Sequence, residues 1–276
     1  MIKGAGMDAP AGGGDEALHA AYALATAFLA SLPQRAVSLV PTPQEMALAL
    51  DEALPEHGSD PAGVVGEWFA RAERGITASP GPRFFGFVNG GATPAALAGD
   101  WLASAIDQNA GLWAGSPAAA QTELVVLRWL QELFALPGAW QGALTSGATM
   151  ANLVGLATAR QWAGRQLGFD AAADGLAGRP PIIVAGSSEI HLSAVKCLGT
   201  LGFGRNQLRR VDAHNGEVDL DALAALLRDI DGPVILIGNA GEVNSGHFDD
   251  LAALADLRDG HPGGAWLHVD AAFGLF

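Results

Sequence analysis

The acidic side chain of Asp270 follows a short apolar run, 266–269, near the end of this 276-residue chain. The run predicts a buried strand, and a carboxylate at the carboxyl end of a strand in an α/β sheet lies where such folds bind ligands. His191 and Ser146 follow two other predicted strands. Because the carboxyl ends of parallel strands meet at one edge of a sheet, the three side chains are predicted to converge on one ligand site.

A run of small and hydroxyl residues, 145–152, joins a predicted strand to a predicted helix. Backbone amides at such a helix start bind an anion, and the helix dipole adds a favourable field. An ordinary helix cap at Ser146 or Thr149 explains the same residues equally well. A P-loop is excluded because no Gly-Lys-Ser/Thr follows, and a dinucleotide fingerprint is excluded because Gly-x-Gly-x-x-Gly is absent.

Two other kinds of site are weaker interpretations of these residues. His261, His268 and Asp270 are close in sequence, but no HExxH motif or Cys/His pair supports a metal site, and none is expected. A Ser-His-Asp hydrolase is disfavoured because Gly-x-Ser-x-Gly is missing at the strand-to-helix turn. The loop 240–246 carries Glu242, and we interpret it as a turn between a strand and a helix.

Composition excludes several classes of partner. The net charge of −14 argues against a nucleic-acid surface and against an anionic membrane partner. No apolar run reaches the roughly 18 residues that a membrane span needs. The one cysteine, Cys197, excludes an internal disulfide and is expected to be a buried, unreactive side chain in a reducing compartment. The sequence therefore predicts a cytoplasmic protein.

The elements that position these residues follow from periodicity and from helix-start signals. Residues 1–14 are predicted to be a disordered tail, and residues 15–92 a helical segment whose helices begin after Thr42 and Asp60. Residues 93–276 alternate helices and strands, which indicates an α/β fold with a mostly parallel sheet and flanking helices. The predicted helices in this part are 95–107, 117–135, 149–163, 191–201, 220–230 and 248–257, and the predicted strands are 143–145, 181–185, 208–211, 234–238 and 265–269.

Five motifs in this order resemble the group II pyridoxal-phosphate-dependent amino acid decarboxylases, which include the glutamate and aromatic amino acid decarboxylases. The resemblance runs from about residue 40 to the last residue. It implies that residues 93–276 are part of a fold-type-I large domain, without the small C-terminal domain. The motifs are Pro82-Arg-Phe-Phe85, Leu97-Ala-Gly-Asp-Trp-Leu102, Thr145-Ser-Gly-Ala-Thr-Met-Ala-Asn-Leu153, Ser188-x-x-His191 and His268-Val-Asp-Ala-Ala272.

The resemblance implies pyridoxal 5′-phosphate as cofactor and assigns its contacts. A helix start would hold the phosphate, and a histidine would stack on the ring. An aspartate would keep the ring nitrogen protonated, which makes the ring an electron sink. A small residue would pack against the ring. These roles fall on Gly147, Ala148 and Thr149 for the phosphate, on His191 and Asp270 as catalytic residues at the ring, and on Ala272.

The resemblance also indicates which residues would lie near the substrate and where the family's Schiff-base lysine would lie. Phe87, Val88 and Asn89 would lie near an amino acid substrate. The family's Schiff-base lysine lies in a His-Lys pair beyond the Asp270 motif, and Lys196 matches no family position. We therefore expect this chain to be a fragment that is inactive alone.

The function predicted on these grounds is the decarboxylation of an amino acid by a protein that is a homodimer at full length. A fold-type-I aminotransferase is an alternative, because the phosphate-binding helix start and the ring-pairing aspartate are shared. A non-catalytic remnant that only dimerises is another. Glu242 stands where many relatives have threonine, which puts a contact by that residue in doubt.

Overall fold

The computed structural model describes residues 14–272 and 274–276. The chain divides into two compact units, Met1–Asp107 and Gln108–Phe276. The predicted disordered tail lies outside the described residues apart from Gly14, with which the first helix begins. The predicted domain boundary at residue 92 falls inside the first unit and stays a prediction.

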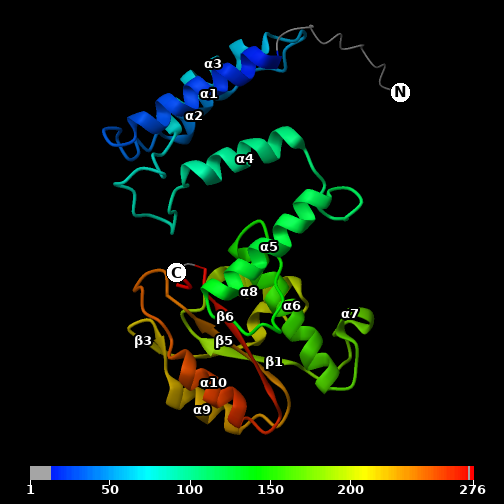
Figure 1. Cartoon of the computed structure of the whole chain (residues 1–276). Helices are drawn as coiled ribbons and strands as arrows, with labels where there is room; N and C mark the ends of the chain where they lie inside the picture. The colour runs from blue at the N-terminus through cyan, green and yellow to red at the C-terminus, as the bar shows by residue number, and fades with distance from the viewer. Residues whose placement is uncertain (1–13, 273) are drawn as a thin grey trace. The chain divides into compact units, whose positions relative to one another are not determined.

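The first unit is helical (Figure 1), and its helices begin where the sequence predicts. Thr42 and Glu45 form a capping box. The Thr42 Oγ1 accepts from the Glu45 N–H at 3.2 Å, and the Glu45 carboxylate accepts from the Thr42 N–H at 2.7 Å. The Asp60 and Thr93 side chains cap α3 and α4 by accepting from the N–H groups of Gly63 and Ala96. The elements are α1 Gly14–Ser31, α2 Pro43–Leu50, α3 Pro61–Ala72, the 3-10 turn η1 Glu73–Gly75, and α4 Pro94–Ile106.

The second unit is built on a parallel sheet. Among the described residues, four strands pair in the order β2-β1-β5-β6, all parallel, and β3 and β4 form a separate antiparallel hairpin. The strand order reverses at β1, and ligands of open α/β sheets bind at such a switch point, beyond the carboxyl ends of the strands. The strands are β1 Ile183–Ser187, β2 Leu208–Val211, β3 Ala213–His214, β4 Glu217–Val218, β5 Val234–Asn239 and β6 Ala265–Asp270.

Helices cover both faces of this sheet, as Figure 1 shows. Alternate strand residues divide between two apolar clusters: Ile235 and Ile237 pack with α6 and α8, whereas Val234 and Leu236 pack with α9 and α10. The prediction of an α/β fold with a parallel sheet and flanking helices is therefore confirmed. The helices of this unit are α5 Pro117–Leu133, α6 Ala148–Gln166, α7 Ala171–Asp174, α8 Leu192–Thr200, α9 Leu220–Arg228 and α10 Leu251–Gly260, with the 3-10 turn η2 Arg205–Gln207.

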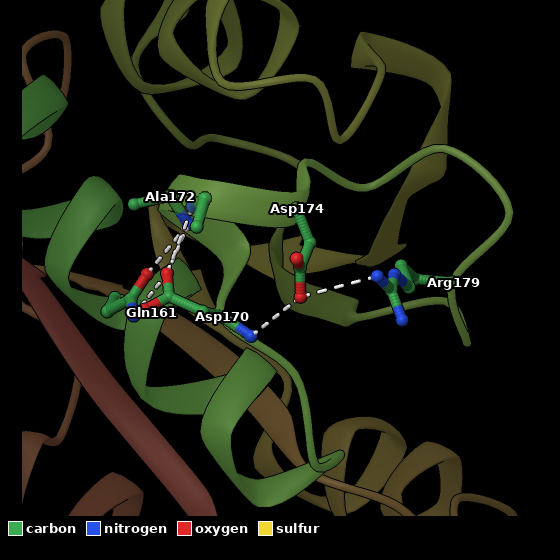
Figure 2. Close-up of polar contacts among 6 residues, drawn as sticks. Gln161, Asp170, Ala172, Asp174 and Arg179 are labelled. Atoms are coloured by element: carbon green, nitrogen blue, oxygen red, sulfur yellow. Dashed lines mark hydrogen bonds and ion pairs between the residues drawn. The ribbon is translucent and has the colours of Figure 1, made fainter.

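Hydrogen bonds and an ion pair hold the connection from α6 to β1 in a compact turn. Figure 2 shows the Asp170 carboxylate accepting from the Ala172 N–H at 2.9 Å and from the Gln161 side chain at 3.0 Å. Asp174 accepts from the Asp170 N–H and pairs with Arg179 at 3.3 Å. These bonds close the single turn α7, while Phe169 and Ala171 are buried against the α6–α8 cluster.

One predicted strand and one predicted helix start are wrong for physical reasons. The predicted strand 143–145 has no strand partner, and the Leu144 N–H instead donates to the Glu123 carboxylate at 3.1 Å. The helix predicted from residue 248 begins at Leu251, because Asp250 is its N-cap and accepts from the Ala253 N–H. Asp249 belongs to the preceding loop.

Candidate functional site

Asp270 is the last residue of β6, and both of its carboxylate oxygens have partners. The Oδ2 accepts from the Asn152 Nδ2 at 2.9 Å, and the Oδ1 accepts from the Ala272 N–H at 3.2 Å. In the sheet register Asp270 lies beside Asn239, the last residue of β5. The half-buried carboxylate is thus fixed at the carboxyl edge of the sheet, where the sequence predicts it.

His268 lies on the same face of β6 as Asp270, because the strand continues regularly to its last residue. Its Nε2 is 2.7 Å from the Asn152 Oδ1, and the side chain is buried. Burial lowers the pKa of His268, and the neighbouring Asp270 carboxylate opposes that shift only partly. His268 and Asp270 therefore meet on the amide of Asn152.

His191 caps α8 from the loop after β1. Its Nδ1 accepts from the Ser193 N–H at 3.2 Å and lies 2.7 Å from the Ser193 Oγ. The buried Ser193 Oγ is in turn 3.2 Å from the Asn152 Nδ2. The structure thus connects His191 with Asp270 through two buried polar residues, Ser193 and Asn152, that sequence reasoning does not single out.

The start of α6 has no side-chain cap, unlike α2, α3, α4, α5, α8, α9 and α10. Gly147 is the N-cap residue, and a Cβ built on it would meet no atom within 4 Å. The interpretation of Ser146 or Thr149 as an ordinary cap is therefore wrong. Residues 146–150 are exposed, so the backbone N–H groups of Ala148 and Thr149 face open space at the positive end of the helix.

Asn239 adds an unused donor next to Asp270. The side chain is 3% exposed, and its Nδ2 has no hydrogen-bond partner among the described residues. It follows Ile235 and Ile237 at alternate positions of β5, so it lies on the face that α6 and α8 cover. A buried amide without a partner is costly, which makes this atom a candidate contact for a bound group.

The two ends of the loop after β5 are joined by hydrogen bonds. Asp249 accepts from the Asn239 N–H at 2.7 Å and donates its own N–H to the Asn239 carbonyl at 3.0 Å. Inside the loop the buried Glu242 accepts from the N–H groups of Asn244 and Ser245 at 2.9 and 2.7 Å. Burial alone would raise the pKa of Glu242, but the hydrogen bonds from these donors outweigh burial, so the pKa is lowered. Glu242 thus serves the turn, as the sequence interpretation has it.

Cys197 and His261, which are not part of this hydrogen-bonded cluster, take structural positions. The Cys197 side chain is 3% exposed, as predicted, and burial together with the nearby Asp270 raises the pKa of its thiol. His261 contacts the Gly232 carbonyl at 2.9 Å, at the amino end of β6. Within residues 14–272 and 274–276, no group of three or more His, Cys, Asp or Glu side chains could hold a metal ion.

The predicted substrate residues Phe87, Val88 and Asn89 lie in the first unit, in the loop after α3. Phe87 and Val88 have φ angles of 56° and 58°, in the left-handed region that few non-glycine residues adopt. Phe87 is 90% exposed. The loop after α3 is therefore irregular at these residues.

Comparison with known proteins identifies the family of this chain. The conserved domain of the pyridoxal-dependent decarboxylases matches residues 43–275. The chain belongs to this family. The aromatic-L-amino-acid decarboxylase of Bacillus atrophaeus is 30% identical over 230 residues, which are 82% of this chain and 45% of that protein. The L-2,4-diaminobutyrate decarboxylase of Rhizobium meliloti (strain 1021) is 34% identical over 184 residues, or 65% of this chain and 34% of that protein.

Solved structures of decarboxylases show the same fold. The glutamate decarboxylase domain of a Vibrio parahaemolyticus transaminase and L-2,4-diaminobutyrate decarboxylase superposes with a TM-score of 0.85 at 22% identity, over 94% of this chain and 57% of that one. The Oryza sativa enzyme solved with PLP and tryptamine gives 0.83 at 24% identity. This chain of the pyridoxal-dependent decarboxylase family spans less than half the length of the two curated relatives above. In the part of the chain that the structure describes, no helix is long and apolar enough to cross a membrane.

Proposed function

We propose that this chain binds pyridoxal 5′-phosphate and that the whole protein decarboxylates an amino acid. The observation that carries the proposal is the hydrogen-bonded cluster that joins Asp270 to His191 at the carboxyl edge of the sheet. It is supported by membership in the pyridoxal-dependent decarboxylase family.

The described residues offer a donor and acceptor set that fits this cofactor. The uncapped N–H groups of Ala148 and Thr149 suit a phosphate. The Asp270 carboxylate suits a protonated ring nitrogen, since a nearby anion favours the charged form. The unpaired Nδ2 of Asn239 suits an acceptor on the ring. The phosphate, the ring nitrogen and one acceptor on the ring therefore each have a counterpart near this edge of the sheet.

When bound, the cofactor supplies an electron sink for the electron pair that loss of CO₂ leaves behind. Asp270 would hold the proton on the ring nitrogen, and Ala272 would pack against the ring. Gly147 would admit the phosphate, because no atom stands within 4 Å of its missing Cβ. His191 would stack on the ring from the start of α8, with its Nδ1 held by Ser193.

Binding of pyridoxal 5′-phosphate to the purified chain tests this proposal. Quenching of tryptophan fluorescence would report saturable binding, and Asp270→Asn is expected to weaken it at least about tenfold, the effect of losing a charged hydrogen bond. Asp256→Asn, on the exposed side of α10, is the matched control and should bind normally. Lys196→Ala should also bind normally. Equal affinity of Asp270→Asn and the natural chain would contradict the proposal.

The substrate loop belongs to the same proposal. Phe87 and Val88 hold uncommon backbone conformations in an exposed loop, and such outliers concentrate where ligands bind. We infer that Phe87, Val88 and Asn89 contact the amino acid in the full-length protein. Release of CO₂ from aromatic amino acids, glutamate, 2,4-diaminobutyrate and cysteine sulfinate would identify the substrate. Phe87→Ala is expected to change the ratio of kcat/KM between these substrates, and an unchanged ratio would remove the loop from the site.

A homodimer is the assembly that we propose for the full-length protein. Its support here is the number of large apolar side chains left open to solvent, including Leu102 and Ile106 on α4 and Trp129 and Leu133 on α5.

A further inference from the structure

The amide of Asn152 is the point where the polar groups of the candidate site meet. The side chain is 3% exposed and lies in the second turn of α6. It contacts His268 at 2.7 Å, Asp270 at 2.9 Å and Ser193 at 3.2 Å. One amide therefore touches the two ends of the site, β6 and the start of α8.

The chemistry of these partners fixes the direction of every bond. A carboxylate only accepts, so the Nδ2 of Asn152 faces Asp270 and its Oδ1 faces His268. The Nε2 of His268 must therefore carry the ring proton and donate to that Oδ1. The second proton of the Asn152 Nδ2 goes to the Ser193 Oγ.

The hydroxyl of Ser193 donates the next hydrogen bond, to His191. Because the His191 Nδ1 already accepts from the Ser193 N–H, it has no proton of its own and accepts from the Ser193 hydroxyl as well. Each hydrogen bond from His268 through Asn152 and Ser193 to His191 therefore has one donor and one acceptor. The proton of the His191 ring is then on Nε2.

Gly155, three residues after Asn152 on the same face of α6, makes room for the His268 ring. A Cβ at residue 155 would lie 2.7 Å from the Cε1 and 2.8 Å from the Nδ1 of His268. Glycine weakens a helix interior relative to alanine, so its presence here needs a reason. The close approach of the ring is that reason.

We propose that Asn152 is the positioning residue of the site: seated by His268 against Gly155, it holds the Asp270 carboxylate directly and the His191 ring through Ser193. The identity of the group that Asp270 and His191 receive rests on the proposed function, whereas the hydrogen-bond geometry does not.

The burial of His268 supports this role. Burial lowers the pKa of His268, which keeps the ring neutral with a single proton near neutral pH. A neutral ring has one donor and one acceptor nitrogen, and the donor is committed to Asn152. A doubly protonated ring would instead need a second acceptor next to Gly155.

Gly155→Ala is the sharpest test, because it changes no polar group. Histidine ring nitrogens of the chain, labelled with ¹⁵N, report which nitrogen is protonated. We expect the natural chain to show the Nε2–H form for His268, and Gly155→Ala to shift or broaden these resonances. The matched control is Gly66→Ala in α3, where a Cβ meets nothing within 4 Å, and it should leave the His268 resonances unchanged.

Two further variants separate the branches of the network. Ser193→Ala should perturb the His191 resonances and leave those of His268 in place, since it removes only the link to His191. Asn152→Ala should perturb both histidines. Pyridoxal 5′-phosphate affinity should fall at least about tenfold in Asn152→Ala, while circular dichroism confirms that the variant is folded.

An Nδ1–H form of His268 in the natural chain would overturn the proposal. So would unchanged histidine resonances in folded Gly155→Ala or folded Asn152→Ala. If no variant and not even the natural chain binds pyridoxal 5′-phosphate, the proposed function fails for this chain, yet the histidine resonances still decide the role of Asn152.

Discussion

Asn152 and Ser193 show why a site is harder to predict than the residues at its centre. Asp270 and His191 each follow a predicted strand, so strand ends alone indicate them. Asn152 contacts Asp270 across 118 residues of sequence and Ser193 across 41, and no local pattern reports such pairs. One signal is present all the same: Asn152 is the polar member of the buried stripe of α6, which continues with Leu156, Ala159 and Ala163.

His268 makes the stability of the fold depend on pH. Its pKa in the folded chain lies below the ordinary value of 6.5, mainly because the ring is buried. The unfolded chain therefore takes up this proton first as the pH falls. The contribution is fully present above about pH 6.5 and is lost as the pH falls through the folded pKa, by at most about 1.4 kcal/mol per pH unit.

Urea unfolding at several pH values measures this contribution. The free energy of unfolding should fall less steeply between about pH 7 and pH 5 in His268→Gln than in the natural chain. His57→Gln, an exposed histidine in the first unit, is the control and should keep the natural slope. Parallel curves for His268→Gln and the natural chain would show that the His268 ring is not held neutral.

At the scale of elements, helix starts are the part that the sequence predicts best. Thr42, Asp60, Thr93 and Ser116 each precede a proline and cap a helix, since cap and proline act within one turn. The strand predicted at 143–145 is absent because a strand, unlike a cap, depends on residues outside its own segment. A strand exists only with a partner, and the three residues Ala143, Leu144 and Thr145 do not specify one.

Loss of the Thr42 cap should destabilise α2. Thr42→Ala removes the acceptor of the Glu45 N–H and is expected to lower the free energy of unfolding of the first unit by about 1 kcal/mol. Thr122→Ala in α5 is a matched control, because that hydroxyl only donates back to the Ala118 carbonyl inside a helix. Equal losses in the two variants, measured by urea unfolding, would show that the cap contributes nothing.

The start of α6 allows helix stability and ligand binding to be separated. Gly147→Asp supplies the missing side-chain cap, but φ at residue 147 is 157°, where any side chain is strained, so we expect the melting temperature to fall as it does in Gly147→Ala, the matched control for ligand binding. The added carboxylate also occupies the space of the phosphate, so pyridoxal 5′-phosphate affinity should fall steeply. Calorimetry and a fluorescence titration on the same sample measure both effects. Unchanged affinity would place the phosphate elsewhere.

At the scale of the whole molecule, the parallel sheet of the second unit follows from alternation of short apolar runs with helices. That alternation does not predict the register of the strands or the reversal of strand order at β1, because both depend on which buried strands pair. Val234–Asn239 is buried at every position, so its own pattern does not indicate which face meets which helix.

Self-association is the expected behaviour of the whole chain. Large apolar side chains are exposed, while a net charge of −14 drives copies apart. Salt screens that repulsion over about 10 Å at 0.1 M, so the average mass should rise with both protein and salt concentration. Analytical ultracentrifugation across a salt series measures this. A monomer under all of these conditions would count against the proposed dimer.

The closed loop after β5 has a consequence for how this protein can vary. Asn239 and Asp249 join its two ends by a pair of hydrogen bonds, and Glu242 satisfies the amides inside it. Because the Ala240 N–H also donates to the Asp270 carbonyl, we expect only changes of length or sequence between Gly241 and Phe248 to leave β5 in place. Evolution can rebuild this rim of the sheet while the strand that ends beside Asp270 stays where it is.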